Sequence, residues 1–338
     1  MPGDVSIIVP VWNGRALVER LMGSIRAQTC PVAKVLVVDN GSEDGAPEAA
    51  EALGAQVIRM GRNAGFSRAV NRGIAECGTA WTAVVNSDVE LAPAWLEMLI
   101  AAGNDPEVWF ATGKILNAAD HGLIDGTYDA LSRGGCAWRV GNGRADGAEF
   151  SKAASIQFAS GTATIFRTQL FQRVGLFDET FESYLEDVEF GLRCACFGYA
   201  GRYVPEAVAY HVGSATLGQW HPETVCRIAR NQVFLVAKYY PARFLLVLWW
   251  PVLVGQALWG FTAMRHGAMG AFLRGKLQGL RGFSAYRRVL RPGKVNAQKL
   301  FRIVAQSEQE IARVQRAAGS DWYWRVYFAL TPLGRTEA

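Results

Sequence analysis

The chain lacks acidic residues over one long stretch. Residues 224–307 contain 14 lysines and arginines but no aspartate or glutamate, whereas residues 1–223 contain 17 basic and 26 acidic residues. This shift in charge predicts a boundary near Glu223, between an acidic domain at 1–223 and a basic, apolar region at 224–338. With 50% hydrophobic and only 19% charged residues, the 338-residue chain cannot be a disordered or fibrous protein.

Cysteine and histidine are also scarce. The six cysteines are scattered and form no CxxC pair, and only four histidines are present, which argues against a structural zinc site or a disulfide framework. The first residues show neither a basic segment nor an apolar segment before a cleavage site. We therefore expect no secretory signal and a reducing, cytoplasmic setting for the acidic domain.

Neither G-x-G-x-x-G nor a P-loop occurs, so the common phosphate-binding motifs are absent as well. What the first hundred residues do contain is a regular alternation. Apolar runs at 5–9, 35–38, 56–60 and 81–85 read as buried strands, and helical patterns at 15–27, 47–53, 66–76 and 93–101 separate them. This order predicts a doubly wound α/β sheet. Farther on, 113–150 reads as loops with short strands, 160–167 as a turn entering a strand, and 185–197 as a helix.

Polar clusters follow three of the predicted strands, where doubly wound sheets bind their ligands. They are Trp12-Asn13, Asp39-Asn40 and Asn86-Ser87-Asp88. Any single cluster is equally well explained by turn formation, but three together favour a binding site. Asp88 stands one residue short of a D-x-D pair, so it could hold Mg²⁺ or Mn²⁺ only with ligands from a diphosphate.

Three other segments carry candidate chemistry. Gly65 begins a helix with Arg62, Arg68 and Arg72 nearby, which suits a phosphate or an ordinary capped surface helix. Glu186-Asp187 opens the helix at 185–197, where one carboxylate could act as a general base or both could simply favour the helix start. His211 ends an apolar run, as a hydrogen-bonding turn residue or as a metal ligand.

Taken in order, these residues resemble a known family. The set is Pro10-x-Trp12-Asn13, Asp39-Asn40-Gly-Ser-x-Asp44, Arg62-Asn63-x-Gly65-Phe66, Asn86-Ser-Asp88, Glu186-Asp187-Val-Glu and then His211. It looks like a family 2 GT-A glycosyltransferase, and within that family it is similar to the bacterial rhamnosyltransferase-like group. The resemblance covers residues 4–215.

The resemblance implies a role for each matching residue. At the nucleotide sugar it places Pro10, Trp12, Asn13, Asp39, Asn40, Arg62, Asn63, Gly65 and Asn86. Asp88 would be the carboxylate that binds Mg²⁺ or Mn²⁺, with His211 as a further ligand. Asp187 would be the base that deprotonates the acceptor hydroxyl, with Glu186 in support. The chain departs from many relatives at Asn86, where they carry aspartate.

The implied reaction is transfer of a sugar, with inversion, from a nucleotide-sugar donor to a hydroxyl of a lipid-linked or cell-surface glycan. The subgroup suggests L-rhamnose from dTDP-rhamnose. One alternative is a catalytically inactive, membrane-bound module that binds sugar nucleotides or glycans. Another is a sugar nucleotidyltransferase, which would need a Gly-rich, Arg-containing loop after the first strand, where Pro-Val-Trp-Asn stands.

The basic region contains one long apolar segment. Residues 244–264 carry no charge and are long enough to cross a membrane. A single span would put ten lysines and arginines of residues 265–302 on the far side, against the positive-inside rule, and Pro251 and Gly255 interrupt the run. We expect an interfacial or re-entrant hairpin with basic amphipathic helices, at the cytoplasmic face of the inner membrane.

A buried helical appendage or an interface of a homo-oligomer is the alternative. Nucleic acid is not expected as a partner, because the basic residues are interleaved with long apolar runs.

Overall fold

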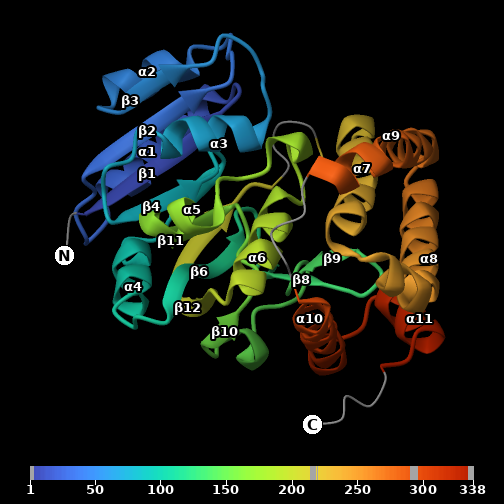
Figure 1. Ribbon diagram of the computed structural model, residues 1–338. Coiled ribbons are helices and arrows are strands. Elements are labelled where there is room, and N and C mark those ends of the chain that lie inside the picture. Colours follow the sequence, from blue (N-terminus) through green and yellow to red (C-terminus); the bar gives the residue numbers. More distant parts are fainter. Residues whose placement is uncertain (1–3, 214–217, 219, 290–295, 334–338) are drawn as a thin grey trace. The chain divides into compact units, whose positions relative to one another are not determined.

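A computed structural model describes residues 4–213, 218, 220–289 and 296–333. The chain forms two compact units, which are coloured by sequence in Figure 1. The first comprises Met1–Asp129 and Gly141–Thr216, and the second comprises Ala130–Val140 and Leu217–Ala338. The charge pattern of the sequence predicts a boundary at residue 223. The structure divides a few residues earlier, and its second unit also includes a segment from the middle of the chain.

The first unit is built on one mixed sheet with the strand order β10-β12-β6-β11-β4-β1-β2-β3, beside which β5 pairs with β12 and β7 pairs with β6. Its strands are β1 Val5–Val11, β2 Lys34–Asp39, β3 Gln56–Arg59, β4 Trp81–Val85, β5 Val89–Leu91, β6 Val108–Asn117, β7 Ile124–Gly126, β10 Ala154–Ile156, β11 Ala163–Arg167 and β12 Ala200–His211. The helices are α1 Arg15–Arg26, α2 Ala46–Ala52, α3 Phe66–Ile74, α4 Trp95–Ala102, α5 Thr168–Val174 and α6 Glu186–Phe197.

Strands β1 to β4 are parallel neighbours; β1, β2 and β4 are largely buried on both faces, whereas β3 is at the edge of the sheet and partly exposed. Ile7 and Val9 point into a core shared with α1, α2 and α4, while Ile8 points to the other face, where it packs against Gly73 of α3. Such double burial explains why β1, β2 and β4 are nearly continuous apolar runs. The predicted doubly wound order is therefore confirmed for this half of the sheet.

The other half contains strands that run in both directions. β11 lies antiparallel between β4 and β6, while β12 runs parallel to β6. The β6–β12 register shifts between Val204 and Val208, and a Cβ on Gly113 would lie 1.7 Å from the carbonyl oxygen of Ala207. Only glycine fits at this close approach of two backbones.

The second unit is mainly helical. It contains α7 Pro222–Tyr239, α8 Ala242–Arg265, α9 Met269–Val289, α10 Ala297–Ala317, α11 Trp322–Leu330 and a hairpin of β8 Asp129–Leu131 and β9 Ala137–Arg139. Helices α7 and α9 pack so closely that a Cβ on Gly275 would lie 2.2 Å from the carbonyl oxygen of Cys226. α8 is one continuous helix through Pro251, so the expected interruption of the apolar run is wrong. Proline removes a single donor, which a 24-residue helix packed on one side tolerates.

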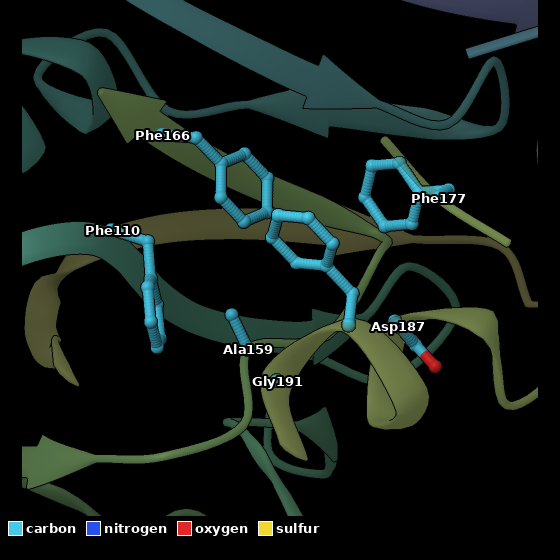
Figure 2. A pocket seen from close by; sticks show the side chains of 7 residues that line it. Phe110, Ala159, Phe166, Phe177, Asp187 and Gly191 are labelled. Carbon is cyan, nitrogen blue, oxygen red and sulfur yellow. The ribbon is translucent and has the colours of Figure 1, made fainter. Parts of the chain in front are cut away.

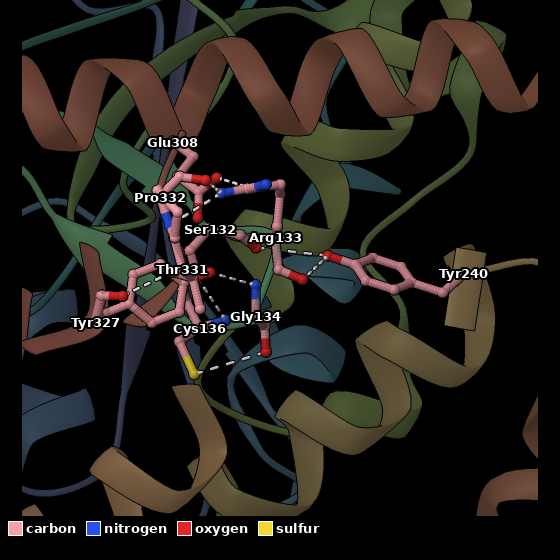
Figure 3. Close-up of polar contacts among 9 residues, drawn as sticks. All are labelled: Ser132, Arg133, Gly134, Cys136, Tyr240, Glu308, Tyr327, Thr331 and Pro332. Atoms are coloured by element: carbon pink, nitrogen blue, oxygen red, sulfur yellow. Dashed lines mark hydrogen bonds and ion pairs between the residues drawn. The ribbon is translucent and has the colours of Figure 1, made fainter. Parts of the chain in front are cut away.

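A buried polar network ties the hairpin to α7, α10 and α11 (Figure 3). The Arg133 guanidinium pairs with the Glu308 carboxylate and donates to the carbonyl oxygens of Thr331 and Pro332, both at 3.2 Å. Gly134 N donates to the hydroxyl oxygen of Tyr327 at 3.0 Å. These bonds explain why the hairpin belongs to the second unit although it lies in the middle of the sequence.

Candidate active site

Two loops at the carboxyl ends of β1 and β2 form one rim of the site. The strands are in parallel register with Val11 beside Asp39, and Asn40 N donates to the carbonyl oxygen of Val11 at 2.7 Å. Asp39 Oδ1 accepts from Ser42 N at 2.8 Å, and the hydroxyl oxygen of Ser42 accepts from Asn13 N at 2.8 Å. The rim is held by its own polar groups, and Asp39 and Asn40 are buried in it.

Asp44 fastens the same two loops from the outer side. Its Oδ2 accepts from the backbone N–H groups of Gly14 and Arg15 at 2.6 and 2.9 Å. Slight burial acts to raise the pKa of Asp44, but these bonds and one from Ala46 N outweigh it and lower the pKa. Asp44 therefore supports the rim, whereas Pro10 and Trp12 lie half-buried along it.

A turn at residues 62–65 packs on this rim. The Asn40 side chain donates to the Gly65 carbonyl oxygen at 3.2 Å and accepts from Ala64 N at 3.1 Å. The Asn63 side chain accepts from Gly65 N at 3.1 Å, so it closes its own turn. The Arg62 side chain is exposed. The backbone of Arg62 lies so close to Gly41 that a Cβ added to Gly41 would be 2.8 Å from the Cα of Arg62.

The same turn holds the segment that precedes α6. A Cβ on Gly65, which has φ +89°, would lie 3.0 Å from the carbonyl oxygen of Glu182, and that oxygen accepts from Ser67 N at 2.9 Å. Glu182, Tyr184 and Leu185 all have positive φ, a strained backbone for residues with side chains. Strain of this kind is retained where the surroundings fix the conformation, and here it sets the start of α6.

The predicted acidic pair begins α6. Asp187 is half-buried, and its Oδ2 accepts from Gly161 N at 2.9 Å while its Oδ1 accepts from Val188 N at 2.8 Å. Glu186 is buried, with 6% of its surface exposed. Each carboxylate oxygen of Asp187 keeps a second lone pair, so the group can still accept a proton while its position is fixed.

Helix α6 is anchored by a cluster of phenyl rings that forms a small pocket (Figure 2). The Phe190 ring stacks on Phe177 at 4.7 Å and meets Phe166 edge-on at 5.7 Å between ring centroids. Asp187 is the one charged residue among those that line this pocket. Because these rings are rigid and closely packed, they restrict movement of the helix that carries Asp187.

A short path of hydrogen bonds connects Asp187 with the end of β4. Asn86 N donates to the carbonyl oxygen of Thr162 at 2.9 Å, and Thr162 follows Gly161, which binds Asp187. The loop that carries Asp88 and the start of α6 are therefore neighbours.

Asp88 and His211 meet at this edge. β5 pairs with β12 so that Val89 lies opposite His211, and Asp88 Oδ1 comes 3.1 Å from His211 Nε2. On the other side of the ring, His211 Nδ1 lies 2.9 Å from Asp125 Oδ2. Burial alone lowers the pKa of His211, but the hydrogen bonds and charges of Asp125 and Asp88 outweigh it and raise the pKa to about 9.

These groups fit a divalent cation only in part. The pair of carboxylates stabilises a positive charge at His211, and a carboxylate oxygen beside an imidazole nitrogen suits Mn²⁺ or Mg²⁺. Asp125 is on the far side of the ring from Asp88, and within the described ranges no three His, Cys, Asp or Glu side chains are arranged to hold an ion. A cation held here would therefore need further ligands from other molecules, such as the oxygens of a diphosphate.

Sequence reasoning missed Asp125 and Gly161. Asp125 lies on β7 within a stretch rich in glycine and aspartate, 86 residues from the histidine that it contacts. Gly161 acts through its backbone N–H, which any residue type has. Neither residue carries a local pattern that distinguishes it.

Comparison with known proteins gives consistent results. The model of a family described as glycosyl transferase family 2 matches residues 6–175. The N-acetylglucosaminyl-diphospho-decaprenol L-rhamnosyltransferase of Mycobacterium tuberculosis is 27% identical over 295 residues, which are 80% of this chain and 94% of that protein.

Two solved structures share the fold. GalNAc-T7 with UDP, GalNAc and Mn²⁺ superposes with a TM-score of 0.62 at 14% identity, over 93% of this chain and 57% of the other. The mannosyltransferase of Pyrobaculum calidifontis with GDP-Man and Mn²⁺ has a TM-score of 0.52 at 18% identity, over 99% and 88%. The GT-A fold is thus confirmed, and with the family match covering residues 6–175 the chain belongs to glycosyl transferase family 2, as a nucleotide-sugar glycosyltransferase.

Proposed function

We propose that the enzyme transfers L-rhamnose from dTDP-rhamnose, with inversion, to a hydroxyl of a lipid-linked saccharide. The observation that carries this proposal is the fixed Asp187 carboxylate beside the strand ends that hold Asp39 and Asp88. The sugar and the acceptor class follow the mycobacterial relative, whose name states a rhamnosyl transfer to a saccharide on a decaprenyl diphosphate.

Each residue then has a physical task. Asp39, in the rim of the β1 and β2 loops, binds the nucleoside, with Pro10 and Trp12 along the rim, and Asn40 holds the rim to the turn at residues 62–65. Asp88 and His211 would hold Mg²⁺ or Mn²⁺, which neutralises charge on the leaving diphosphate when bound.

Asp187 is the general base. It accepts the proton of the acceptor hydroxyl as that oxygen attacks the anomeric carbon in line with the departing diphosphate, and this single displacement inverts the configuration. The backbone N–H groups of Gly161 and Val188 hold its carboxylate in place for this step.

Binding of nucleotides to the full chain in detergent tests the donor site. We expect dTDP to bind more tightly with Mn²⁺ than without it, and Asp88→Ala to abolish this metal dependence. Asp105→Ala removes an aspartate that is 43% exposed and should change nothing.

Tighter binding of UDP or GDP than of dTDP would contradict rhamnose as the donor sugar and leave the transferase assignment standing. No binding of any nucleotide would favour the alternative, an inactive module on a membrane.

We also propose that the second unit binds the cytoplasmic face of the plasma membrane through one side of α8. Residues 246, 250, 253, 257, 261 and 264, spaced three or four apart, form an exposed apolar stripe on this helix. In this stripe Leu246 is 79%, Leu253 52% and Met264 47% exposed. Basic residues Arg243 and Arg265 stand at its two ends, and no acidic residue occurs in α8 or α9, which suits anionic lipid headgroups.

The opposite side of α8 argues against a transmembrane span. Among the described residues α8 is the one helix long and apolar enough to cross a bilayer, yet 28% of its apolar window is buried against its own unit. There Gln256 bonds to the Lys276 ammonium and donates to the Gly134 carbonyl oxygen at 2.9 Å. A span would carry these polar partners into hydrocarbon, so we favour a helix lying in the interface.

Sedimentation of the full chain with lipid vesicles tests the membrane surface. We expect recovery with vesicles that contain anionic lipid and weaker recovery with neutral vesicles. A dimer that does not bind either kind of vesicle would contradict the proposal and assign the stripe to a second copy of the chain.

A further inference from the structure

The His211 imidazole is held from both sides. Its Nε2 faces Asp88 Oδ1 at 3.1 Å, and its Nδ1 faces Asp125 Oδ2 at 2.9 Å. The side chains are well shielded, with 7% of His211, 14% of Asp88 and 13% of Asp125 exposed. The two carboxylates therefore have different places relative to the ring, one on the side of the proposed metal and one behind it.

Four adjacent strands fix this arrangement. β7, β6, β12 and β5 are neighbours in that order, with Leu116 of β6 opposite Ile124 of β7 and beside Tyr210 of β12. Asp125 follows Ile124, and His211 follows Tyr210, so the register places the carboxylate two strands away from the histidine. The contact depends on the sheet rather than on a flexible loop.

Asp125 is itself held in place. Its backbone carbonyl oxygen accepts from the Asn142 side chain at 2.8 Å. On the far side of its carboxylate, a Cβ on Gly213, two residues after His211, would lie 3.4 Å from its Oδ1. The chain on both sides of the contact thus limits how Asp125 can turn.

We infer that Asp125 is a positioning residue that acts through His211 on the metal site. The inference rests on the proposed function, because it assumes that Asp88 and His211 bind the cation. When a cation takes the place of the Nε2 proton, Asp125 still accepts the Nδ1–H hydrogen bond, which fixes the plane of the ring and leaves the Nε2 lone pair on the side of Asp88. A carboxylate behind a metal-binding histidine also makes the ligating nitrogen more basic, and loss of such a partner typically weakens metal binding by about 10- to 100-fold.

Asp125→Asn is the informative variant, because it keeps the size of the side chain. Its amide N–H can donate to Nδ1, which favours the tautomer with hydrogen on Nε2, the form that cannot ligate. We expect about 10- to 100-fold weaker Mn²⁺ binding, measured by calorimetry in the presence of dTDP. Asp120→Asn, an exposed aspartate of the same segment, is the matched control and should bind Mn²⁺ as the wild type does.

A spectroscopic readout separates positioning from a merely structural role. With Mg²⁺ and dTDP bound, ¹⁵N spectra of labelled histidine should show His211 protonated at Nδ1 alone in the wild type. In Asp125→Asn the two tautomers should both appear, and His211→Gln assigns the signal.

The outcomes also distinguish this inference from the proposed function. If Asp125→Asn binds Mn²⁺ as tightly as the wild type while Asp88→Ala does not, the positioning role is wrong and the donor site stands. If the wild type with dTDP binds no Mn²⁺, both the metal-dependent function and the inference fail. Weakened binding with an unchanged His211 spectrum would overturn the positioning role and assign Asp125 to packing.

Discussion

The two units differ in where they expose apolar side chains. In the first unit the core is apolar, and polar side chains gather at the ends of strands, around Asp39, Asp88 and Asp187. Both units bury a charged pair, Glu189 with Arg193 in the first and Glu308 with Arg133 in the second. What sets the second unit apart is the exposed apolar side of α8, where Leu246 is 79% exposed. A protein in water hides apolar surface, so this difference supports the proposal that the second unit binds an apolar partner through α8.

The largest effect that this comparison predicts is confined to the first unit. Asp187→Asn removes the proposed base, and we expect rhamnosyl transfer to a polyprenyl-diphospho-N-acetylglucosamine to fall about 10²- to 10⁴-fold. Affinity for dTDP and for anionic vesicles should not change.

Asp178→Asn is the control for that variant, because Asp178 also accepts from a backbone N–H, that of Thr180 at 3.0 Å. Normal turnover by Asp187→Asn would refute the assignment of the base.

The next effect belongs to the second unit. Glu308→Ala leaves the Arg133 guanidinium buried without its carboxylate, which typically costs about 3–5 kcal/mol of stability. Native-state hydrogen exchange should then accelerate in α10. The Kd for dTDP, which the first unit binds, should change by no more than about twofold, whereas a loss of about 1.4 kcal/mol in binding would change it tenfold.

Glu310→Ala breaks a pair with Arg313, which is 51% exposed, and should cost less than about 1 kcal/mol. Equal exchange in the two variants would show that the buried pair does not hold this unit together.

The smallest effect concerns the apolar stripe of α8. Replacing Leu246 and Leu253 with serine should weaken binding to anionic vesicles by roughly 1.5 kcal/mol for each leucine, because less apolar surface enters the lipid. Leu176→Ser changes an exposed leucine of the first unit and should leave vesicle binding unaltered. If the Leu246→Ser, Leu253→Ser and Leu176→Ser variants bind anionic vesicles equally well, a surface other than the apolar stripe of α8 contacts the lipid.

Much of the first unit could be predicted because its information is local. Runs such as residues 5–9 and 81–85 are apolar on both faces, which only a strand in the middle of a layered sheet requires. Asp39 and Asp88 follow such runs directly, so their place at one edge of the sheet follows from strand direction alone. The pair Glu186-Asp187 is visible because it opens a well-patterned helix, but the choice of Asp187 as the base comes from the family resemblance.

The parts that could not be predicted depend on distant partners. Asp125 reaches His211 through the pairing of β7, β6 and β12, and no short pattern encodes that register. The hairpin Ala130–Val140 joins the second unit through Arg133, whose partner Glu308 lies 175 residues away. Pro251 suggested a break in the apolar segment, but packing on one side of α8 keeps the helix whole.

The Asn40 side chain shows how narrow the choice of residue is at one position. It donates to the Gly65 carbonyl oxygen and accepts from Ala64 N, and a side-chain amide does both through separate atoms without carrying a charge. Aspartate, which a single base change in the codon would introduce, has the same shape but would set a negative charge against the Gly65 oxygen. A nearly isosteric mutation would thus loosen the nucleoside rim and, through Gly65 and Glu182, the approach to the catalytic helix. In a collection of sequences from this lineage, position 40 should accordingly drift far less than the exposed positions beside it.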